Sequence, residues 1–170
     1  MDPADKEIQS LVGQVARTFD ERGYQLAVAE SCTGGLLAGA ITDLAGVSSF
    51  FIGGIVSYSD EVKQALLGVP VAVLADHGAV SEQTARAMAD GVRNRLDADV
   101  GVGITGIAGP GGATDRKPVC LVYIAVATPD RALCREDIWP GDRAAVRQAS
   151  VRAALELILQ GLGEQEAVNL

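Results

Sequence analysis

The residues best suited to do chemistry stand together in one segment, QLAVAESCTGG at positions 25–35. A short apolar run ends in Glu30, Ser31 and Cys32, and a glycine pair follows at Gly34 and Gly35. This pattern predicts a strand that turns sharply into a helix, whose first backbone N–H groups point at whatever lies there. A hydroxyl, a thiol and a carboxylate beside free N–H donors are the groups that acyl transfer at an amide or ester requires.

Ser31 is the first candidate nucleophile, and the alternative is that Ser31 only N-caps the helix that follows it. A histidine base is not expected, because His77, the one histidine, lies in a predicted turn. A lysine can act as the base when burial lowers its pKa, and Lys63 is the best placed of the three lysines. The alternative for Lys63 is an exposed helix lysine that pairs with Asp60.

Cys32 is the rival nucleophile, because a thiol at a helix N-terminus has a lowered pKa. Its alternative is a small buried apolar residue. Glu30 and Asp43 are the only carboxylates considered for Mg²⁺, which they would hold through water. Because one histidine and three scattered cysteines give no ligand spacing, we expect neither a metal nor another cofactor.

The glycine-rich segment GVGITGIAGPGG occupies residues 101–112. Gly101, Gly103 and Gly106 match the pattern G-x-G-x-x-G of dinucleotide-binding proteins, but the match lies inside a predicted strand and no helix follows it. The dinucleotide interpretation is therefore rejected. What remains is a loop over 106–118 that either connects two strands or holds a phosphate or an oxyanion on its N–H groups.

Arg143 stands at the start of the last predicted helix, after Gly141 and Asp142. The helix dipole does not favour a cation there. The position is explained if Arg143 reaches a bound anion, and the alternative is a salt bridge to Asp142 or to another surface carboxylate.

Hydrophobic periodicity predicts helices and strands that alternate over the first hundred residues and then a hairpin. Strands are expected over 25–30, 50–58, 100–105, 119–128 and 133–139. Helices are expected over the apolar face from Ile8 to Phe19 and over about 33–44, 60–67, 81–96 and 142–160. This order predicts a three-layer α/β/α domain with a mixed, mostly parallel sheet and a C-terminal β-hairpin.

Ligands of such sheets bind beyond the carboxyl ends of the strands, so Glu30–Cys32 and Thr105–Gly106 are expected to share one site. The chain of 170 residues is 48 % hydrophobic and only 4 % aromatic, which suits one domain over 1–170 with a core over about 8–160. A net charge of −8 argues against a nucleic-acid surface. The polar, acidic N-terminus and the lack of a long apolar run predict a cytoplasmic protein without a membrane partner.

The motifs in their order resemble the CinA C-terminal domain family of nicotinamide-nucleotide amidases over about residues 8–160. They are ESCTGG at 30–35, GIVSYS at 54–59, EVK at 61–63, LGV at 67–69, HGAVS at 77–81, ITGIAGPGG at 104–112, KPV at 117–119 and GDR at 141–143. Ala113 and Cys120 depart from the family, since glycine is common at both positions.

The resemblance implies a stand-alone amidase that converts nicotinamide mononucleotide and water to nicotinic acid mononucleotide and ammonia, in the recycling of pyridine nucleotides. It implies Ser31 as nucleophile and Lys63 as base, with Lys63 or Tyr58 as the proton donor to ammonia. The residues expected to bind substrate are Glu30, Thr33, Gly34, Gly35, Ser48, Thr105, Gly106, Gly109 and Arg143.

Three other interpretations stay open at this point. The main one is a non-catalytic, nucleotide-binding regulatory module that uses the same glycine loop and Arg143. The second is a metal-assisted pyrophosphatase acting on ADP-ribose, and the third is a purely structural domain. The expected partner of the amidase is a small pyridine nucleotide, and a homo-oligomer is possible.

Overall fold

The computed structural model describes residues 2–163 of the chain. Its sheet contains the strands β1 (Leu26–Glu30), β2 (Phe51–Val56), β3 (Val100–Gly106), β4 (Leu121–Ala127) and β5 (Ala132–Ile138). The α-helices are α1 (Pro3–Arg22), α2 (Leu36–Thr42), α3 (Asp60–Leu67), α4 (Val71–His77), α5 (Glu82–Arg95) and α6 (Arg143–Leu162). A short 3₁₀ helix, η1 (Val47–Ser49), precedes β2.

The five strands form one sheet in the order β2-β1-β3-β4-β5. β1 pairs in parallel with β2 and β3, while β4 is antiparallel to both β3 and β5. Four strands therefore run in one direction and only β4 runs against them. This confirms the mixed sheet, in which the hairpin of β4 and β5 is added to a parallel core.

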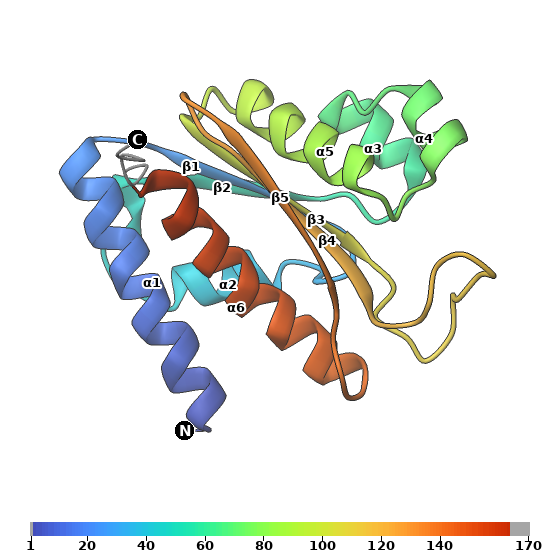
Figure 1. The fold of residues 1–170 in the computed structure, drawn as a ribbon. Helices are drawn as coiled ribbons and strands as arrows, with labels where there is room; N and C mark the ends of the chain where they lie inside the picture. The colour runs from blue at the N-terminus through green and yellow to red at the C-terminus, as the bar shows by residue number, and fades with distance from the viewer. Residues whose placement is uncertain (1, 164–170) are drawn as a thin grey trace, which may run out of the picture.

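Helices cover both faces of the sheet, as the three-layer prediction requires (Figure 1). α1, α2 and α6 pack on one face, and α3, α4 and α5 lie on the other (Figure 1). The larger hydrophobic core lies under α1, α2 and α6 and includes Phe19, Ile41 and Leu155, while Met88 and Val92 of α5 anchor the opposite layer.

Glycines in β3 let α5 approach the sheet closely. A Cβ atom added to Gly101 would lie 2.1 Å from Ala89 O, and one added to Gly103 would lie 2.3 Å from Ala85 O. A side chain at either position would push the helix away from the strand. The spacing of Gly101 and Gly103, which is part of the match to the dinucleotide-binding motif, is thus explained by the packing of α5 on β3. This agrees with the rejection of a dinucleotide site.

One predicted helix begins later than expected, and one observed helix is not predicted. The helix expected over 33–44 begins only at Leu36, because residues 31–35 form a tight turn after β1. α4 was not predicted, since its seven residues begin after Pro70 without a capping side chain. In β2, the pairing with β1 shifts by one residue between Phe51 and Gly53.

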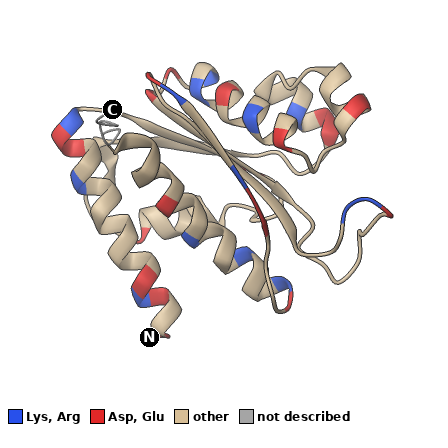
Figure 2. Ribbon diagram, in the orientation of Figure 1, with Lys and Arg blue, Asp and Glu red and all other residues tan. Residues whose placement is uncertain are grey.

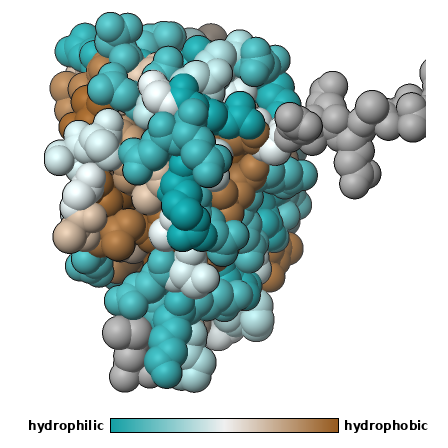
Figure 3. All heavy atoms as spheres, turned by 90° about the vertical axis from the view of Figure 1, so that its left-hand side faces the viewer, coloured by the Kyte–Doolittle hydropathy of each residue, from teal (hydrophilic) through white to brown (hydrophobic). Residues whose placement is uncertain are grey.

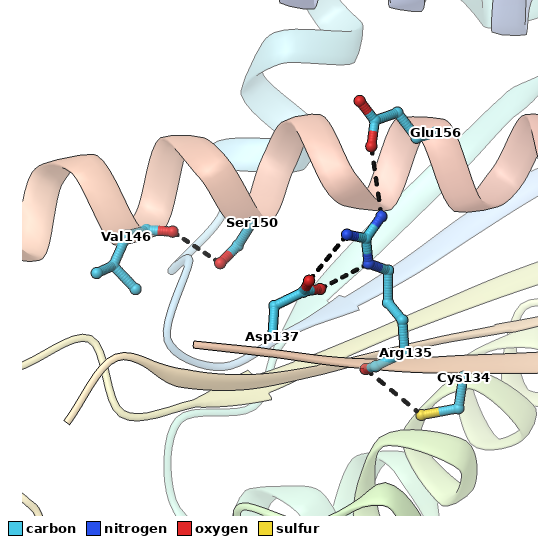
Figure 4. Close-up of polar contacts among 6 residues, drawn as sticks. All are labelled: Cys134, Arg135, Asp137, Val146, Ser150 and Glu156. Carbon is cyan, nitrogen blue, oxygen red and sulfur yellow. Dashed lines mark hydrogen bonds and ion pairs between the residues drawn. The ribbon is translucent and has the colours of Figure 1, made fainter. Parts of the chain in front are cut away.

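Charged side chains lie mainly on the helices, on the loop between β3 and β4, and on β5 (Figure 2). Arg135 of β5 binds both carboxylate oxygens of Asp137, at 2.6 and 2.9 Å, and reaches Glu156 of α6 at 3.3 Å (Figure 4). Arg131 donates to carbonyls at the C-terminal end of α6, among them Gly161 O at 2.9 Å. These contacts fix the axis of α6 against the sheet, which sets where its N-terminus lies.

The β2 edge of the sheet is apolar, in contrast to the charged β5 edge. Viewed from the side of α1, apolar patches flank a mostly hydrophilic strip (Figure 3). Exposed apolar side chains of α2 and β2 include Leu36, Ile52 and Val56. The expected homo-oligomer stays a prediction. No helix within residues 2–163 is long and apolar enough to cross a membrane.

Candidate active site

Ser31 is the first residue after β1 and lies at the carboxyl end of the parallel strands. Its N–H donates to Ile104 O of β3 at 2.9 Å, so the serine is held in line with the sheet. Only 8 % of Ser31 is exposed. The strand-to-turn geometry therefore presents the Ser31 hydroxyl inside a narrow opening rather than on the open surface.

Glu30, not Ser31, caps the N-terminus of α2. The buried carboxylate accepts hydrogen bonds from the backbone N–H groups of Gly35, Leu37 and Ala38 at 3.1, 3.1 and 2.8 Å. Four N–H groups at a helix start need such partners, and a carboxylate is a strong one. The alternative reading of Ser31 as a helix cap is thus excluded, and Glu30 supports the turn instead of facing a ligand.

Lys63 reaches Ser31 from α3, which lies on the other face of the sheet from α2. It lies one turn inside α3, whose start is fixed by the Ser59 hydroxyl accepting from Val62 N–H at 3.3 Å. Only 1 % of Lys63 is exposed, and its Nζ lies 3.1 Å from Ser31 Oγ. The alternative of an exposed lysine paired with Asp60 is therefore wrong: the side chain turns inward and forms no ion pair with a carboxylate of residues 2–163.

The surroundings of the Lys63 amine favour its neutral form. Burial lowers the pKa of Lys63 below its ordinary value of 10.5, and the smaller effects of Asp60 and Cys32 oppose this. Besides Ser31 Oγ, Nζ contacts Ser57 O at 2.8 Å and Tyr58 O at 3.4 Å. A neutral amine has two N–H groups for these two carbonyls and one lone pair for the Ser31 proton.

The lowered pKa of Lys63 predicts a pH-dependent stability. Between the pKa of the folded state and 10.5, the unfolded chain binds a proton that the folded chain does not bind. The free energy of unfolding of the wild type should thus rise with pH across this window, relative to Lys63→Met. Urea titrations of both proteins from neutral pH to about pH 10 measure the difference, and parallel curves would contradict the neutral amine.

Cys32 is a small buried residue, which was the alternative to its role as nucleophile. It is 6 % exposed, and burial raises the pKa of its thiol to about 11. The backbone N–H of Cys32 opposes this shift most, and the positive charges of Arg147 and Lys63 oppose it less. At neutral pH the thiol is protonated, so it is a poor nucleophile beside the serine.

The turn after Ser31 leaves two backbone donors without an oxygen acceptor. Gly34 N–H donates to Ser31 O at 3.1 Å, and Gly35 N–H donates to Glu30. Within residues 2–163, no backbone or side-chain oxygen accepts from the N–H groups of Cys32 and Thr33, although the Cys32 N–H acts on its own thiol, whose pKa it lowers. Of the residues expected to bind substrate, Gly34 and Gly35 therefore have their N–H groups occupied, and the donors without an oxygen acceptor lie directly after the serine.

A cleft of about 240 Å³ opens in front of Ser31 and Lys63. Its walls come from the segment after α4, the end of β3, the glycine-rich loop and the start of α6. Thr105, an expected substrate ligand, donates its hydroxyl to Ala79 O at 2.6 Å and so fixes the wall opposite the loop. Gly106 and Gly109 line the cleft with their backbones.

Tyr58 and Arg143 stand at the mouth of this cleft. The Arg143 guanidinium donates to Gly109 O at 2.9 Å and to the Tyr58 hydroxyl at 3.2 Å. Both side chains are exposed, and Arg143 forms no ion pair with Asp142, whose carboxylate instead caps α6 by accepting from Ala145 N–H at 2.9 Å. The salt-bridge alternative for Arg143 is thus not observed with any carboxylate of residues 2–163, and a cation faces the opening.

Comparison with known proteins shows to which family the chain belongs. A model of the CinA C-terminal domain family matches residues 8–162. The chain is 46 % identical over 160 residues to a putative competence-damage inducible protein of Desulforamulus reducens, covering 92 % of this chain and 38 % of that protein. A CinA-like protein of Geobacter sulfurreducens is 50 % identical over 150 residues, covering 87 % of this chain and 36 % of the relative. This chain belongs to the CinA C-terminal domain family.

Solved structures share the fold of this CinA domain. The competence/damage inducible protein CihA from Agrobacterium tumefaciens superposes with a TM-score of 0.89 at 41 % identity, over 93 % of this chain and 96 % of that one. A CinA superfamily protein from Escherichia coli gives 0.88 at 34 % identity, over 94 % and 92 %. The curated relatives named above are longer, and the chain spans less than two fifths of either.

The CinA domain does not bring every expected residue to the cleft. Ser48 is exposed in η1, before the start of β2, whereas Ser31 follows the end of β1. Because β1 and β2 are parallel, the length of a strand, about 16 Å, separates the two serines. Glu30 and Asp43 lie at opposite ends of α2, so they cannot share a cation.

The sequence reading also missed residues that the CinA domain uses. The Ser57 carbonyl accepts from Lys63, and Ala79 and Val80 form a wall of the cleft. Arg147 of α6 donates to Thr33 O at 2.9 Å. No local pattern marks backbone carbonyls, but the spacing of Arg143 and Arg147, one helical turn apart, was a signal. Within the described chain, no three His, Cys, Asp or Glu side chains group as metal ligands.

Proposed function

We propose that this CinA domain is an amidase that hydrolyses the carboxamide of nicotinamide mononucleotide to the carboxylate, with release of ammonia. The observation that carries this proposal is the buried Lys63 Nζ at 3.1 Å from Ser31 Oγ, at the end of a cleft. A lysine amine with a lowered pKa, in reach of a hydroxyl, is a base–nucleophile pair for acyl transfer. A module that only binds a nucleotide would have no use for a lysine buried against a serine hydroxyl.

The first half of the reaction forms an acyl-enzyme. Neutral Lys63 takes the proton of the Ser31 hydroxyl as Oγ attacks the carboxamide carbon. The carbonyl oxygen becomes negative and is bound by the N–H groups of Cys32 and Thr33; one such donor is worth roughly 3 kcal/mol. The Lys63 ammonium then returns the proton to the leaving nitrogen, the C–N bond breaks, and ammonia leaves with an ester on Ser31.

The second half repeats these steps with water. Lys63, neutral again, takes a proton from a water molecule that attacks the ester carbon. The same two N–H groups bind the second oxyanion, and the proton on Lys63 passes to Ser31 Oγ as the ester bond breaks. The product is released from Ser31 as the carboxylic acid, which loses its proton to solvent or to ammonia, and the resting pair is restored. Tyr58, at the mouth of the cleft, remains the alternative proton donor to ammonia.

Arg143 gives the cleft a preference for a phosphorylated substrate. It lies beside Gly109 at the opening, where the 5′-phosphate of a nucleotide would project once the ring lies at Ser31. A charge-assisted bidentate contact fits a guanidinium and a phosphate. We place this activity in the cytoplasm, in the recycling of pyridine nucleotides.

Arg143→Ala should raise KM for the mononucleotide by about 10- to 100-fold, because it removes charge-assisted hydrogen bonds to phosphate. Activity on the corresponding riboside, which has no phosphate, should change little. Steady-state kinetics on both substrates check this, with Arg152→Ala as a control farther along the same helix. Equal losses on both substrates would show that Arg143 does not bind the phosphate.

Ammonia release from a panel of pyridine nucleotides tests the proposed function. The mononucleotide should be hydrolysed, and activity should persist after treatment with a chelator. Tight binding without turnover would favour a regulatory module instead. Chelator-sensitive cleavage of ADP-ribose without ammonia release would favour a pyrophosphatase.

A further inference from the structure

Arg147 links α6 to the turn that carries Ser31. Its guanidinium donates to Thr33 O at 2.9 Å, across 114 positions of the chain. Within the described residues it forms no ion pair with a carboxylate, and its Nε is buried without a hydrogen-bond partner. A buried donor that lacks a partner is uncommon in folded proteins. The side chain is therefore placed by its contact with the turn and not by an acidic neighbour.

The turn is held by opposite charges on its two sides. Glu30 binds three N–H groups at its far end, including that of Gly35. Arg147 binds Thr33 O, which also accepts from Leu36 N–H at 3.1 Å. An anion on the N–H groups and a cation on the carbonyl together fix a segment whose two glycines would otherwise leave it free to rotate.

Fixing Thr33 O decides which way the neighbouring peptides face. Gly34 has φ +59°, a conformation that glycine enters and leaves at little cost. With the carbonyl bound to Arg147, no oxygen of residues 2–163 accepts from the N–H groups of Cys32 and Thr33, directly after Ser31. Without that contact, the peptides of the turn gain other orientations.

We infer that Arg147 is a positioning residue for the Ser31 turn, which it holds so that the backbone N–H groups of Cys32 and Thr33 bind the reacting oxyanion. This role rests on the proposed acyl transfer. It differs from that of Arg143, which faces Tyr58 at the open mouth and is exposed. Arg147 is half-buried and its guanidinium contacts the backbone of the turn, so it acts through the turn.

Arg147→Met should lower kcat about 100-fold and change KM by less than about threefold, because misplaced donors affect mainly the transition state. Arg152→Met, in the same helix, removes an arginine that pairs with Glu7 at 3.6 Å and should leave both parameters unchanged. A raised KM with an unchanged kcat would overturn the inference and make Arg147 a substrate ligand.

A fluorophosphonate probe separates this inference from the proposed substrate. Ser31 Oγ attacks the phosphorus, fluoride leaves, and Lys63 takes the serine proton, so labelling reports the nucleophile and its oxyanion donors without a nucleotide. The labelling rate of Arg147→Met should fall by about the same factor as kcat. A wild type that is labelled but releases no ammonia would refute the substrate alone. Normal labelling of Arg147→Met would overturn the role of Arg147.

Rescue distinguishes positioning from general loss of structure. Arg147 lines two openings of about 620 and 660 Å³, so a small cation can enter from solvent. Guanidinium ions, at concentrations that leave the fold intact, should restore labelling to Arg147→Ala but not to Ser31→Ala. Arg147→Gln, whose uncharged amide is two bonds shorter than the guanidinium and so loses the contact with Thr33 O, is measured if the other variants do not fold. Failure of rescue in a folded Arg147→Ala, or normal labelling of Arg147→Gln, would overturn the inference.

Discussion

Ser31→Ala should lower ammonia release by at least about 10⁴-fold, because no other group can form the acyl-enzyme. The fold should survive, since the Ser31 hydroxyl makes no contact that builds the turn: Glu30 caps α2, and the serine backbone provides the bond to Ile104 O. Thermal unfolding of the variant within a few degrees of the wild type would show that chemistry and not structure was lost.

Cys32→Ser is the matched control for this loss. The thiol is buried, and its pKa is raised to about 11, so the variant should keep most of its activity. Near-normal turnover by Ser31→Ala would refute the serine as nucleophile. A dead Cys32→Ser with an active Ser31→Ala would transfer the role to the thiol.

Lys63→Met should lower kcat about 10³-fold, because it removes the general base while Ser31 and the oxyanion donors stay in place. Lys63→Arg should not restore activity, since a guanidinium stays protonated at every accessible pH. The dependence of the wild-type rate on pH is an independent test of Lys63 as the base. Activity requires neutral Lys63, so the rate should rise with pH and level off at a pH below 10.5, the ordinary pKa of lysine.

The pH dependence of the wild-type rate and that of the residual rate of Lys63→Met must both point to Lys63 as the titrating group. A residual rate in Lys63→Met that keeps the same acid limb would show that another group titrates. Equal activity of Lys63→Arg and the wild type would show that only a positive charge is needed at this position, which excludes the proton transfer proposed for Lys63.

Much of the fold followed from the sequence because its elements are locally determined. Alternation of apolar runs with helical periodicity is sufficient to predict the five strands and the hairpin of β4 and β5. α4 was missed because a helix of seven residues after a proline has no strong start signal. The start of α2 was misplaced because its cap is Glu30, a residue of the preceding strand, whereas the usual signal is a hydroxyl directly before the helix.

The candidate site was predicted less completely, because it depends on contacts between distant segments. Ser31 and Lys63 came from residue types and from a family resemblance, yet no spacing in the sequence places them 3.1 Å apart. The roles of Glu30 and Arg147 depend on backbone groups of the turn, which have no sequence signal. Ser48 was expected in the cleft from the family resemblance alone, and the parallel direction of β1 and β2 places it at the other end of the sheet.

The proposed mechanism is tested most directly by finding which residue carries the acyl group during turnover. Wild-type protein is mixed with saturating nicotinamide mononucleotide, quenched in acid and digested, and the peptide that contains residues 31 and 32 is fragmented in a mass spectrometer. We expect an acyl group on Ser31 Oγ, present at higher occupancy in early quenches and absent from Ser31→Ala. An acyl group on Cys32, or full turnover with neither residue modified, would contradict the mechanism.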